Sequence, residues 1–298
     1  MDLRTMIVGI VLSLQTALGI LGNVSLLFYY LIIYYNEHTM KKIDMILIHV
    51  FTSNFLTILS KGLPEVVKAF GWKQLFSDVG CKLTNYFQRL ARSMSISTTC
   101  FLSVFQAITI SPRNSCLKEY KTKTTKFMGL FFSLFWILFI LVNMLFPIYT
   151  ATNRNKKNKT QKRDFEFCHS IGRDKLVDIM YTAFCVFPEV IFSLLIVSSS
   201  AFMIFILYGH KKRVQHTLHI HASIRNSAEN RATHNILTLV CTFLAFYTLS
   251  SILQGYIALS NNPSWWVMNI TAIISMCFPT LGPIVISPDF AISRFCFT

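Results

Sequence analysis

The stretch "GCKLTNYFQRLARSMSISTTCFLSVFQAITI", residues 80–110, decides the fold because it places two arginines in a run that becomes almost wholly apolar. Arg89 and Arg92 stand about one helical turn apart in it. The whole chain has 298 residues, of which 53% are hydrophobic and only 14% are charged. Soluble domains carry about 25% charged residues, so the composition predicts a membrane protein.

Seven apolar runs divide the chain, and each is long enough for a helix to cross a bilayer, which takes about 20 residues. Lipid offers the backbone no hydrogen-bond partners, so each run is predicted to be a helix. No linker or low-complexity segment separates the runs. We therefore predict an all-α fold, a seven-transmembrane helix bundle that forms a single domain over residues 1–298. The predicted helices span residues 6–34, 44–67, 83–110, 127–149, 177–207, 232–260 and 265–287.

Charge does not decide the orientation, because the loops on the two sides of the membrane hold almost equal numbers of Lys and Arg. Asn158 begins an Asn-Lys-Thr sequon, which is glycosylated only in the secretory lumen. Cys168 lies in the same loop, Cys81 lies at the same membrane face, and disulfides form on the oxidising side. We therefore predict an extracellular N-terminus, a cytoplasmic C-terminus, a glycan on Asn158 and a Cys81–Cys168 disulfide.

The two arginines lie deep in the predicted third helix. At a rise of 1.5 Å per residue, Arg89 is about 12 Å and Arg92 about 16 Å below Cys81. An arginine at that depth costs at least about 2.5 kcal/mol unless it faces the bundle interior or a wet cavity. The polar residues of this helix form one stripe at helical spacing: Gln88, Arg89, Arg92, Ser95 and Thr99.

Glu189, directly after Pro188 in the predicted fifth helix, is the acidic residue at matching depth. An ion pair with one arginine leaves the other to present its guanidinium to an outward-open cavity. We predict that Arg92 faces this cavity and binds a carbonyl, carboxylate or sulfate of a small, mostly apolar ligand. The structural alternative is that both arginines pair only with Glu189 and backbone carbonyls. The predicted ligand-binding residues are Gln88, Arg89, Arg92, Glu189, Tyr247, Gln254 and Tyr256.

Other polar groups in the helices indicate structure and not chemistry. Lys61, near the outer end of the second helix, is expected to extend toward the membrane interface, with a place on the rim of the ligand pocket as the less favoured alternative. His49 is the single histidine well inside a helix, so a buried three-histidine metal site cannot be built. The sequence holds no His-Glu-x-x-His, no Gly-x-Ser-x-Gly and no phosphate-binding glycine loop. We predict no enzymatic activity, metal or cofactor, and no nucleic-acid partner. A transporter or channel is the alternative from another class, although neither internal repeats nor a filter loop is visible.

Several segments carry a resemblance to a known family: "GNVSLLFYY" (22–30), "LTILSKGLP" (56–64), "QRLARSMSISTTCFLSVFQAITISP" (88–112), "NRATHNILTLV" (230–240), "TFLAFYTLSSI" (242–252) and "FPTLGPIVIS" (278–287). The chain resembles vomeronasal type 1 receptors, which are G protein-coupled receptors, from the first helix to the last. Gln106 stands where rhodopsin-like receptors have Asp-Arg-Tyr, and the last helix has no Asn-Pro-x-x-Tyr. Bitter taste receptors share these departures and are the nearest alternative.

The resemblance implies a plasma-membrane chemosensory receptor for small volatile or semi-volatile cues, including pheromones. It also implies activation of a heterotrimeric G protein of the inhibitory class. Arg225 and Arg231 flank the start of the predicted sixth helix and are expected to contact the G protein, with membrane-surface anchoring as the alternative. Cys296, in the tail "PDFAISRFCFT" (288–298), is placed for palmitoylation if the tail forms an interfacial helix, with a disordered stub as the alternative.

Overall fold

The computed structural model describes residues 3–37, 41–71, 78–111, 117–152, 175–216, 223–260 and 263–295. Within them it describes the side chains of residues 3–36, 41–71, 79–80, 82–111, 127–144, 187–209, 235–257, 260 and 263–286. The elements are α1 (Leu3–Glu37), α2 (Lys42–Thr57), the π-helical turn η1 (Ile58–Gly62), α3 (Leu63–Ala69), α4 (Asp78–Ile110), α5 (Leu117–Thr152), α6 (Lys175–His216), α7 (Ser223–Leu259) and α8 (Trp265–Phe295).

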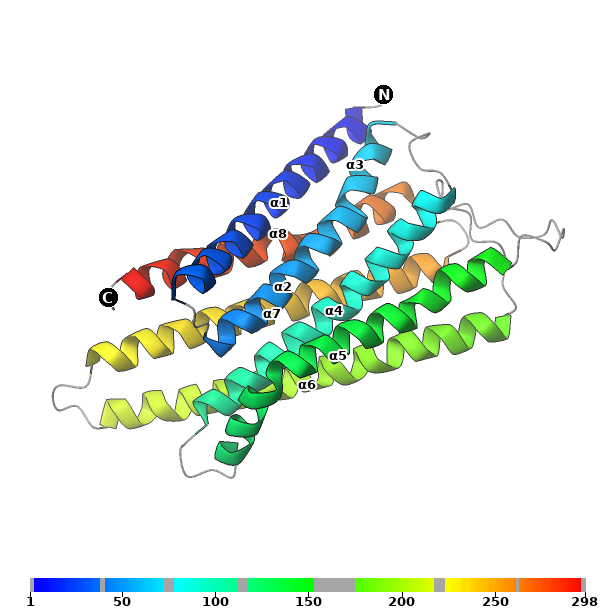
Figure 1. Ribbon diagram of the computed structural model, residues 1–298. Helices are drawn as coiled ribbons and strands as arrows, with labels where there is room; N and C mark the ends of the chain where they lie inside the picture. Colours follow the sequence, from blue (N-terminus) through cyan, green and yellow to red (C-terminus); the bar gives the residue numbers. More distant parts are fainter. Residues whose placement is uncertain are drawn as a thin grey trace.

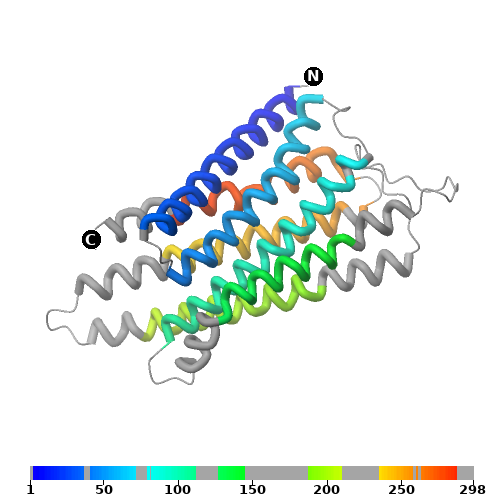
Figure 2. Tube along the Cα trace, viewed as in Figure 1, coloured from blue at the N-terminus to red at the C-terminus, as the bar shows by residue number. Residues whose placement is uncertain are grey.

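Seven of the described helical rods are long and apolar enough to cross a membrane. α2, η1 and α3 follow one another without a break, so together they form one of these seven membrane-spanning segments (Figure 2). This arrangement confirms the predicted all-α, seven-helix fold.

Several helices run past the apolar segments predicted from sequence. α5 begins at Leu117 and α6 ends at His216, whereas the predicted spans begin at residue 127 and end at residue 207. The additional turns, "LKEYKTKTTK" (117–126) and "YGHKKRVQH" (208–216), contain several Lys and Arg residues, which have high helix propensity. The apolar run therefore marks the part of a helix that lies in lipid, and the helix itself continues beyond it.

The passes lie side by side along one direction, and the start of α1 and the end of α8 lie at opposite ends of the bundle (Figure 1). α4 packs against α2, α5, α6 and α7. In its membrane-spanning window 67% of the residues are buried, compared with 17% in α5 and in α6. Its many small and polar residues explain this position, because they permit close helix approach and are costly to expose to lipid.

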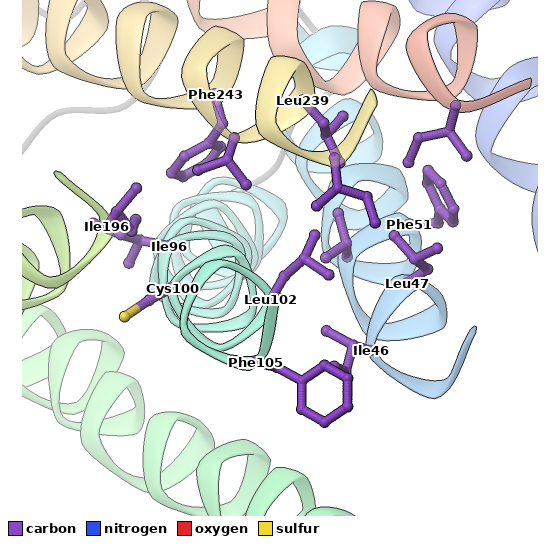
Figure 3. Close-up of a cluster of buried hydrophobic side chains, with 14 of the residues drawn as sticks. Ile46, Leu47, Phe51, Ile96, Cys100, Leu102, Phe105, Ile196, Leu239 and Phe243 are labelled. Carbon is purple, nitrogen blue, oxygen red and sulfur yellow. The ribbon is translucent and has the colours of Figure 1, made fainter. Parts of the chain in front are cut away.

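A buried apolar cluster surrounds the C-terminal half of α4 (Figure 3). Ile96 and Leu102 of α4 are almost completely buried in it. Figure 3 shows side chains of α2, α6 and α7 gathered around this central helix. The labelled contributors from these neighbours are Ile46, Leu47, Phe51, Ile196, Leu239 and Phe243.

Polar contacts join α1 to a proline-containing segment of α8. Pro283 has no N–H, so the carbonyl of Pro279, four residues earlier, lacks its helical donor. Asn23 of α1 supplies the missing bond, because its Nδ2 donates to the Pro279 carbonyl oxygen at 2.8 Å. The same amide nitrogen donates to the Gly19 carbonyl at 2.7 Å, which fixes its direction.

The π turn η1 lies just before another proline, Pro64, whose missing N–H interrupts the regular hydrogen-bond ladder at the carbonyl of Ser60. Neighbouring helices close tightly on this turn. A Cβ on Gly62 would lie 2.6 Å from Met276 Cε and 2.9 Å from Thr16 Oγ1, so only glycine fits without displacement. The turn is therefore held between α1 and α8.

Candidate functional site

The Arg92 side chain of α4 forms a two-pronged ion pair with Glu189 of α6. Arg92 Nε donates to Glu189 Oε1 at 2.9 Å, and Arg92 Nη2 donates to Glu189 Oε2 at 3.2 Å. The side chains are 24% and 22% exposed, respectively. The predicted ion pair of Glu189 is therefore present, but its arginine is Arg92, so Arg92 is not the unpaired arginine that the sequence predicted. Such pairing is what an ionised arginine within the membrane requires.

Arg92 also binds three residues on one face of α7. Its Nη2 donates to Ser251 Oγ at 2.8 Å, and its Nη1 donates to Gln254 Oε1 at 3.2 Å. The guanidinium carbon lies 4.5 Å from the centroid of the Tyr247 ring, a cation–π contact. These residues share a helical face because they are spaced four and three positions apart.

The network leaves limited capacity for a further partner. A guanidinium has five N–H donors, and the hydrogen bonds to Glu189, Ser251 and Gln254 occupy four of those of Arg92. The Tyr247 hydroxyl is buried and makes no hydrogen bond of regular geometry, although it lies within interaction range of Glu189 and Arg92. Within the described residues, one guanidinium N–H of Arg92 and this hydroxyl are therefore donors that remain for a ligand atom.

Part of the predicted ligand site thus forms a single cluster. The predicted residues that meet in it are Arg92, Glu189, Tyr247 and Gln254. Ser251 is a member that the predicted set does not contain. Its helical spacing from Tyr247 and Gln254 is shared by the neighbouring Ser250, so this spacing alone does not identify Ser251.

The other predicted site residues do not hydrogen-bond to the cluster within the described side chains. Gln88 is half-buried on α4, four residues before Arg92. Arg89 is also half-buried and takes part in an interaction of its own. Tyr256 is 56% exposed, so most of its ring faces the surroundings of the bundle. Their roles as ligand contacts stay predictions.

Lys61 points into the bundle. Instead of extending to the membrane interface, its ammonium nitrogen donates to Ser275 Oγ of α8 at 2.6 Å. Ser275 in turn lies four residues before Pro279, so Lys61 reaches the part of α8 that leads into its proline-containing segment. The π turn thus directs a second cationic side chain, besides Arg92, into the helix bundle.

His49 has the structural role that the sequence indicates. Trp136 Nε1 of α5 donates to His49 Nδ1 of α2 at 3.2 Å. The imidazole also stacks on Phe132, with the ring centroids 4.3 Å apart. In the described part of the chain, no group of three His, Cys, Asp or Glu residues is placed to hold a metal ion.

Two apolar grooves lie elsewhere on the bundle. One has a volume of about 380 Å³ between α1 and α2, where Leu27, Tyr34 and Ile48 contribute to its walls. The other has a volume of about 240 Å³ between α4 and α6, next to Ser199 and Phe202. Neither groove is lined by Arg92 or its partners. The outward-open cavity at Arg92 stays a prediction.

Several predicted sites fall outside the described residues or side chains. Cys168, Asn158 and Cys296 lie in segments that the structure does not describe, and the Cys81 side chain is not described either. The backbone of α7 includes the positions of Arg225 and Arg231, whose side chains are likewise not described.

The sequence is similar to those of several known proteins. The sequence profile of the vomeronasal organ pheromone receptor family matches residues 6–298. The chain is similar to Vomeronasal type-1 receptor 4 of Homo sapiens, with 41% identity over 295 residues, which cover 99% of this chain and 98% of that relative. It is similar to Vomeronasal type-1 receptor 2 of Homo sapiens, with 41% identity over 95% of this chain and 72% of that relative. It also resembles Olfactory receptor class A-like protein 1 of Danio rerio, with 28% identity over 96% of this chain and 90% of that relative.

Proposed function

The chain belongs to the vomeronasal organ pheromone receptor family, and on this premise we propose that it binds small volatile or semi-volatile cues, including pheromones, at the Arg92 cluster. It is a multi-pass plasma-membrane receptor of the G protein-coupled class and not an enzyme. The proposal concerns its ligand, the place where that ligand binds, and the way in which binding reaches the G protein.

The observation that supports this site is the contact of Arg92 with α6 and α7 together. A buried ion pair is expensive to maintain for stability alone, because desolvation offsets much of its Coulomb energy. Next to the pair, the Tyr247 hydroxyl is buried without a regular hydrogen bond. A ligand carbonyl or carboxylate satisfies this hydroxyl and the remaining N–H of Arg92, while the apolar remainder of the ligand packs against neighbouring side chains.

The same contacts provide a route from ligand to G protein. A ligand acceptor that approaches Arg92 competes with Ser251 and Gln254, and so loosens the attachment of α7 to α4. Ligand binding then favours conformations in which α7 has moved. α7 is one helix from Ser223 to Leu259, so a displacement near Gln254 reaches its beginning. Arg225 and Arg231 stand there, and we propose that they contact a G protein of the inhibitory class.

This function requires the orientation that the sequence predicts, with the N-terminus and the Arg92 end of the bundle outside the cell. A Cys81–Cys168 disulfide and a glycan on Asn158 belong to the same outer side. The opposite end, with Cys296, then faces the cytoplasm, where a palmitoyl group on Cys296 anchors the tail. Protease protection and glycosidase digestion of intact cells test these assignments together.

The function is tested in cells that co-express the chain and an inhibitory G protein, with cyclic AMP as the readout. The ligand panel consists of small volatile alcohols, ketones, esters and carboxylic acids. We expect one or more compounds to lower cyclic AMP in a pertussis-toxin-sensitive manner. Neutralising Arg225 and Arg231 together weakens that response at equal surface expression. Ligand-driven solute flux in liposomes containing only this chain, without any G protein response in cells, contradicts the proposal and favours a transporter.

A further inference from the structure

Lys61 and Arg92 stand at a similar depth on different walls of the bundle. Lys61 lies about 12 Å below Ala69 at the end of α3, and Arg92 lies about 15 Å below Lys82 near the start of α4, at 1.5 Å per residue. The two cations are close enough to act on each other electrostatically. The outer part of the helix bundle therefore presents two cationic side chains at one level.

The two cations differ in how their charge is compensated. Arg92 has a two-pronged carboxylate partner in Glu189. Lys61 has a hydroxyl as its hydrogen-bond partner, Ser275 Oγ. Among the described side chains, no carboxylate lies within ion-pair distance of the Lys61 ammonium, and Glu65, one turn outward on α3, acts on it only at longer range.

Burial makes this difference costly. A cation removed from water is stabilised by a counter-charge far more than by a neutral hydroxyl. An ammonium has three donors, and Ser275 accepts from one of those of Lys61, so two remain.

Local packing fixes the Lys61 backbone. The residue stands within η1, and the next residue is Gly62, where Met276 and Thr16 leave no room for a Cβ. α1 and α8 therefore hold the π turn on both sides. A π turn inside a helix often marks a functional site, and here it directs a lysine toward α8.

We propose that Lys61 is a second ligand-anchoring residue and that the site it shares with Arg92 takes a small organic anion. The anionic group, a carboxylate or a sulfate, binds the two remaining N–H donors of Lys61, and a second acceptor of the ligand meets Arg92. The inference rests on the proposed function, because it assigns the chemical class of ligand to the same site. It also assigns the discrimination between anions and neutral molecules to Lys61, since the charge of Arg92 is compensated by Glu189.

The test measures the local preference for anions without requiring the natural ligand. Ser275→Cys places a thiol at the Lys61 ammonium in the full-length chain. Unsealed membranes are treated with anionic sulfonatoethyl methanethiosulfonate or with its cationic trimethylammonium analogue, and labelling rates are measured by mass spectrometry of the peptide that contains position 275. The chain without the added cysteine gives the background from Cys277. Each rate is divided by the rate of the same reagent with a small free thiol, because a thiolate reacts intrinsically faster with the cationic reagent. The ratio of these normalised rates also removes any effect of Lys61 on the reactivity of the thiol itself.

We expect the normalised rate of the anionic reagent to be about fivefold higher than that of the cationic reagent, the size of effect that one nearby charge produces in a hydrated site. Lys61→Met should bring the ratio close to one, and Lys61→Arg should preserve it. Lys42→Met, which removes a lysine at the opposite end of the same pass, is the matched control and should leave the ratio unchanged. If Ser275→Cys is not displayed, Met268→Cys, two turns outward on the same face of α8, replaces it.

A ratio that does not respond to Lys61→Met overturns the inference, and so does a thiol that neither reagent reaches. These outcomes are separate from failure of the proposed function, because labelling requires neither agonist nor G protein. A retained anion preference in a chain that never signals contradicts only the proposed function. A normal agonist response with no anion preference contradicts only the assignment of Lys61.

Discussion

Arg92 Nε lies 2.9 Å from Glu189 Oε1, and this ion pair joins α4 to α6 across 97 positions of the sequence. The same guanidinium reaches Ser251 and Gln254 of α7. One side chain therefore fixes the relative positions of three helices at the level where we place the ligand. Any account of signalling in this receptor has to include what happens to these contacts.

The ion pair is expected to contribute to stability only as a pair. Arg92→Met and Glu189→Met each leave an uncompensated buried charge, so each should lower the thermal unfolding midpoint markedly. The double variant Arg92→Met/Glu189→Met should lose less than the sum of the two. A double-mutant cycle from thermal unfolding in detergent should give a coupling energy of about 1–3 kcal/mol. Purely additive losses contradict the pairing.

A larger residue at Gly62 should destabilise the chain. Gly62→Ala places a Cβ 2.6 Å from Met276 Cε, and this overpacking should cost about 1–3 kcal/mol. Gly129 on α5 is the matched control, because a Cβ there meets nothing within 4 Å. Gly129→Ala should therefore leave stability unchanged or raise it by up to about 1 kcal/mol. Equal unfolding midpoints for the two variants argue against tight closure of α1 and α8 on η1.

Asn23 should stabilise the proline-containing segment of α8. Asn23→Leu removes the donor to the Pro279 carbonyl and should lower stability by about 1 kcal/mol, near the range measured for polar contacts between membrane helices. Ser25→Ala is the control, because Ser25 is exposed and its hydroxyl bonds only within α1, to the Gly22 carbonyl. If Asn23→Leu unfolds at the wild-type temperature, the hydrogen bond from Asn23 to the Pro279 carbonyl does not contribute to stability.

The predicted disulfide between Cys81 and Cys168 should close a long loop over the outer end of the bundle. Through loop-closure entropy, this disulfide is expected to raise the free energy of unfolding by about 4 kcal/mol. Cys81→Ser should therefore reduce the amount of receptor at the cell surface. Mass spectrometry of a non-reduced digest should find the two cysteines in one linked peptide. Free thiols at both positions rule the bond out.

Much of the cluster could be predicted from sequence because charge in a membrane is rare. Arg92 and Glu189 stand out in apolar runs, and their depth along the helices places them at one level. Pairing with one arginine and not the other could not be predicted, because Arg89 and Arg92 lie on almost the same helical face. The choice depends on the rotation of α4 against α6, which packing sets.

Ser251 and Lys61 show what a sequence pattern does not contain. A serine in a membrane helix usually bonds to its own backbone, as Ser251 also does with the Tyr247 carbonyl. Nothing in the sequence pattern distinguishes Ser251 from the neighbouring Ser250. The direction of Lys61 depends on the π turn, which shifts the helical register by part of a turn. The position of Lys61 near the end of the second helix predicted a lysine extending to the interface, whereas the structure turns it toward Ser275.

The most direct test of the ligand site compares Arg92→Ala, Arg92→Lys and Arg92→Ala/Glu189→Ala at matched surface expression, with cyclic AMP responses to an agonist that bears a carbonyl or carboxylate. The account predicts that both alanine variants lose the response and that Arg92→Lys recovers only part of it, because lysine cannot make the two-pronged contact. The double variant leaves no unpaired buried charge, so it separates lost binding from lost folding. A wild-type response in the displayed double variant contradicts the account, because it means that the ligand binds and signals without Arg92.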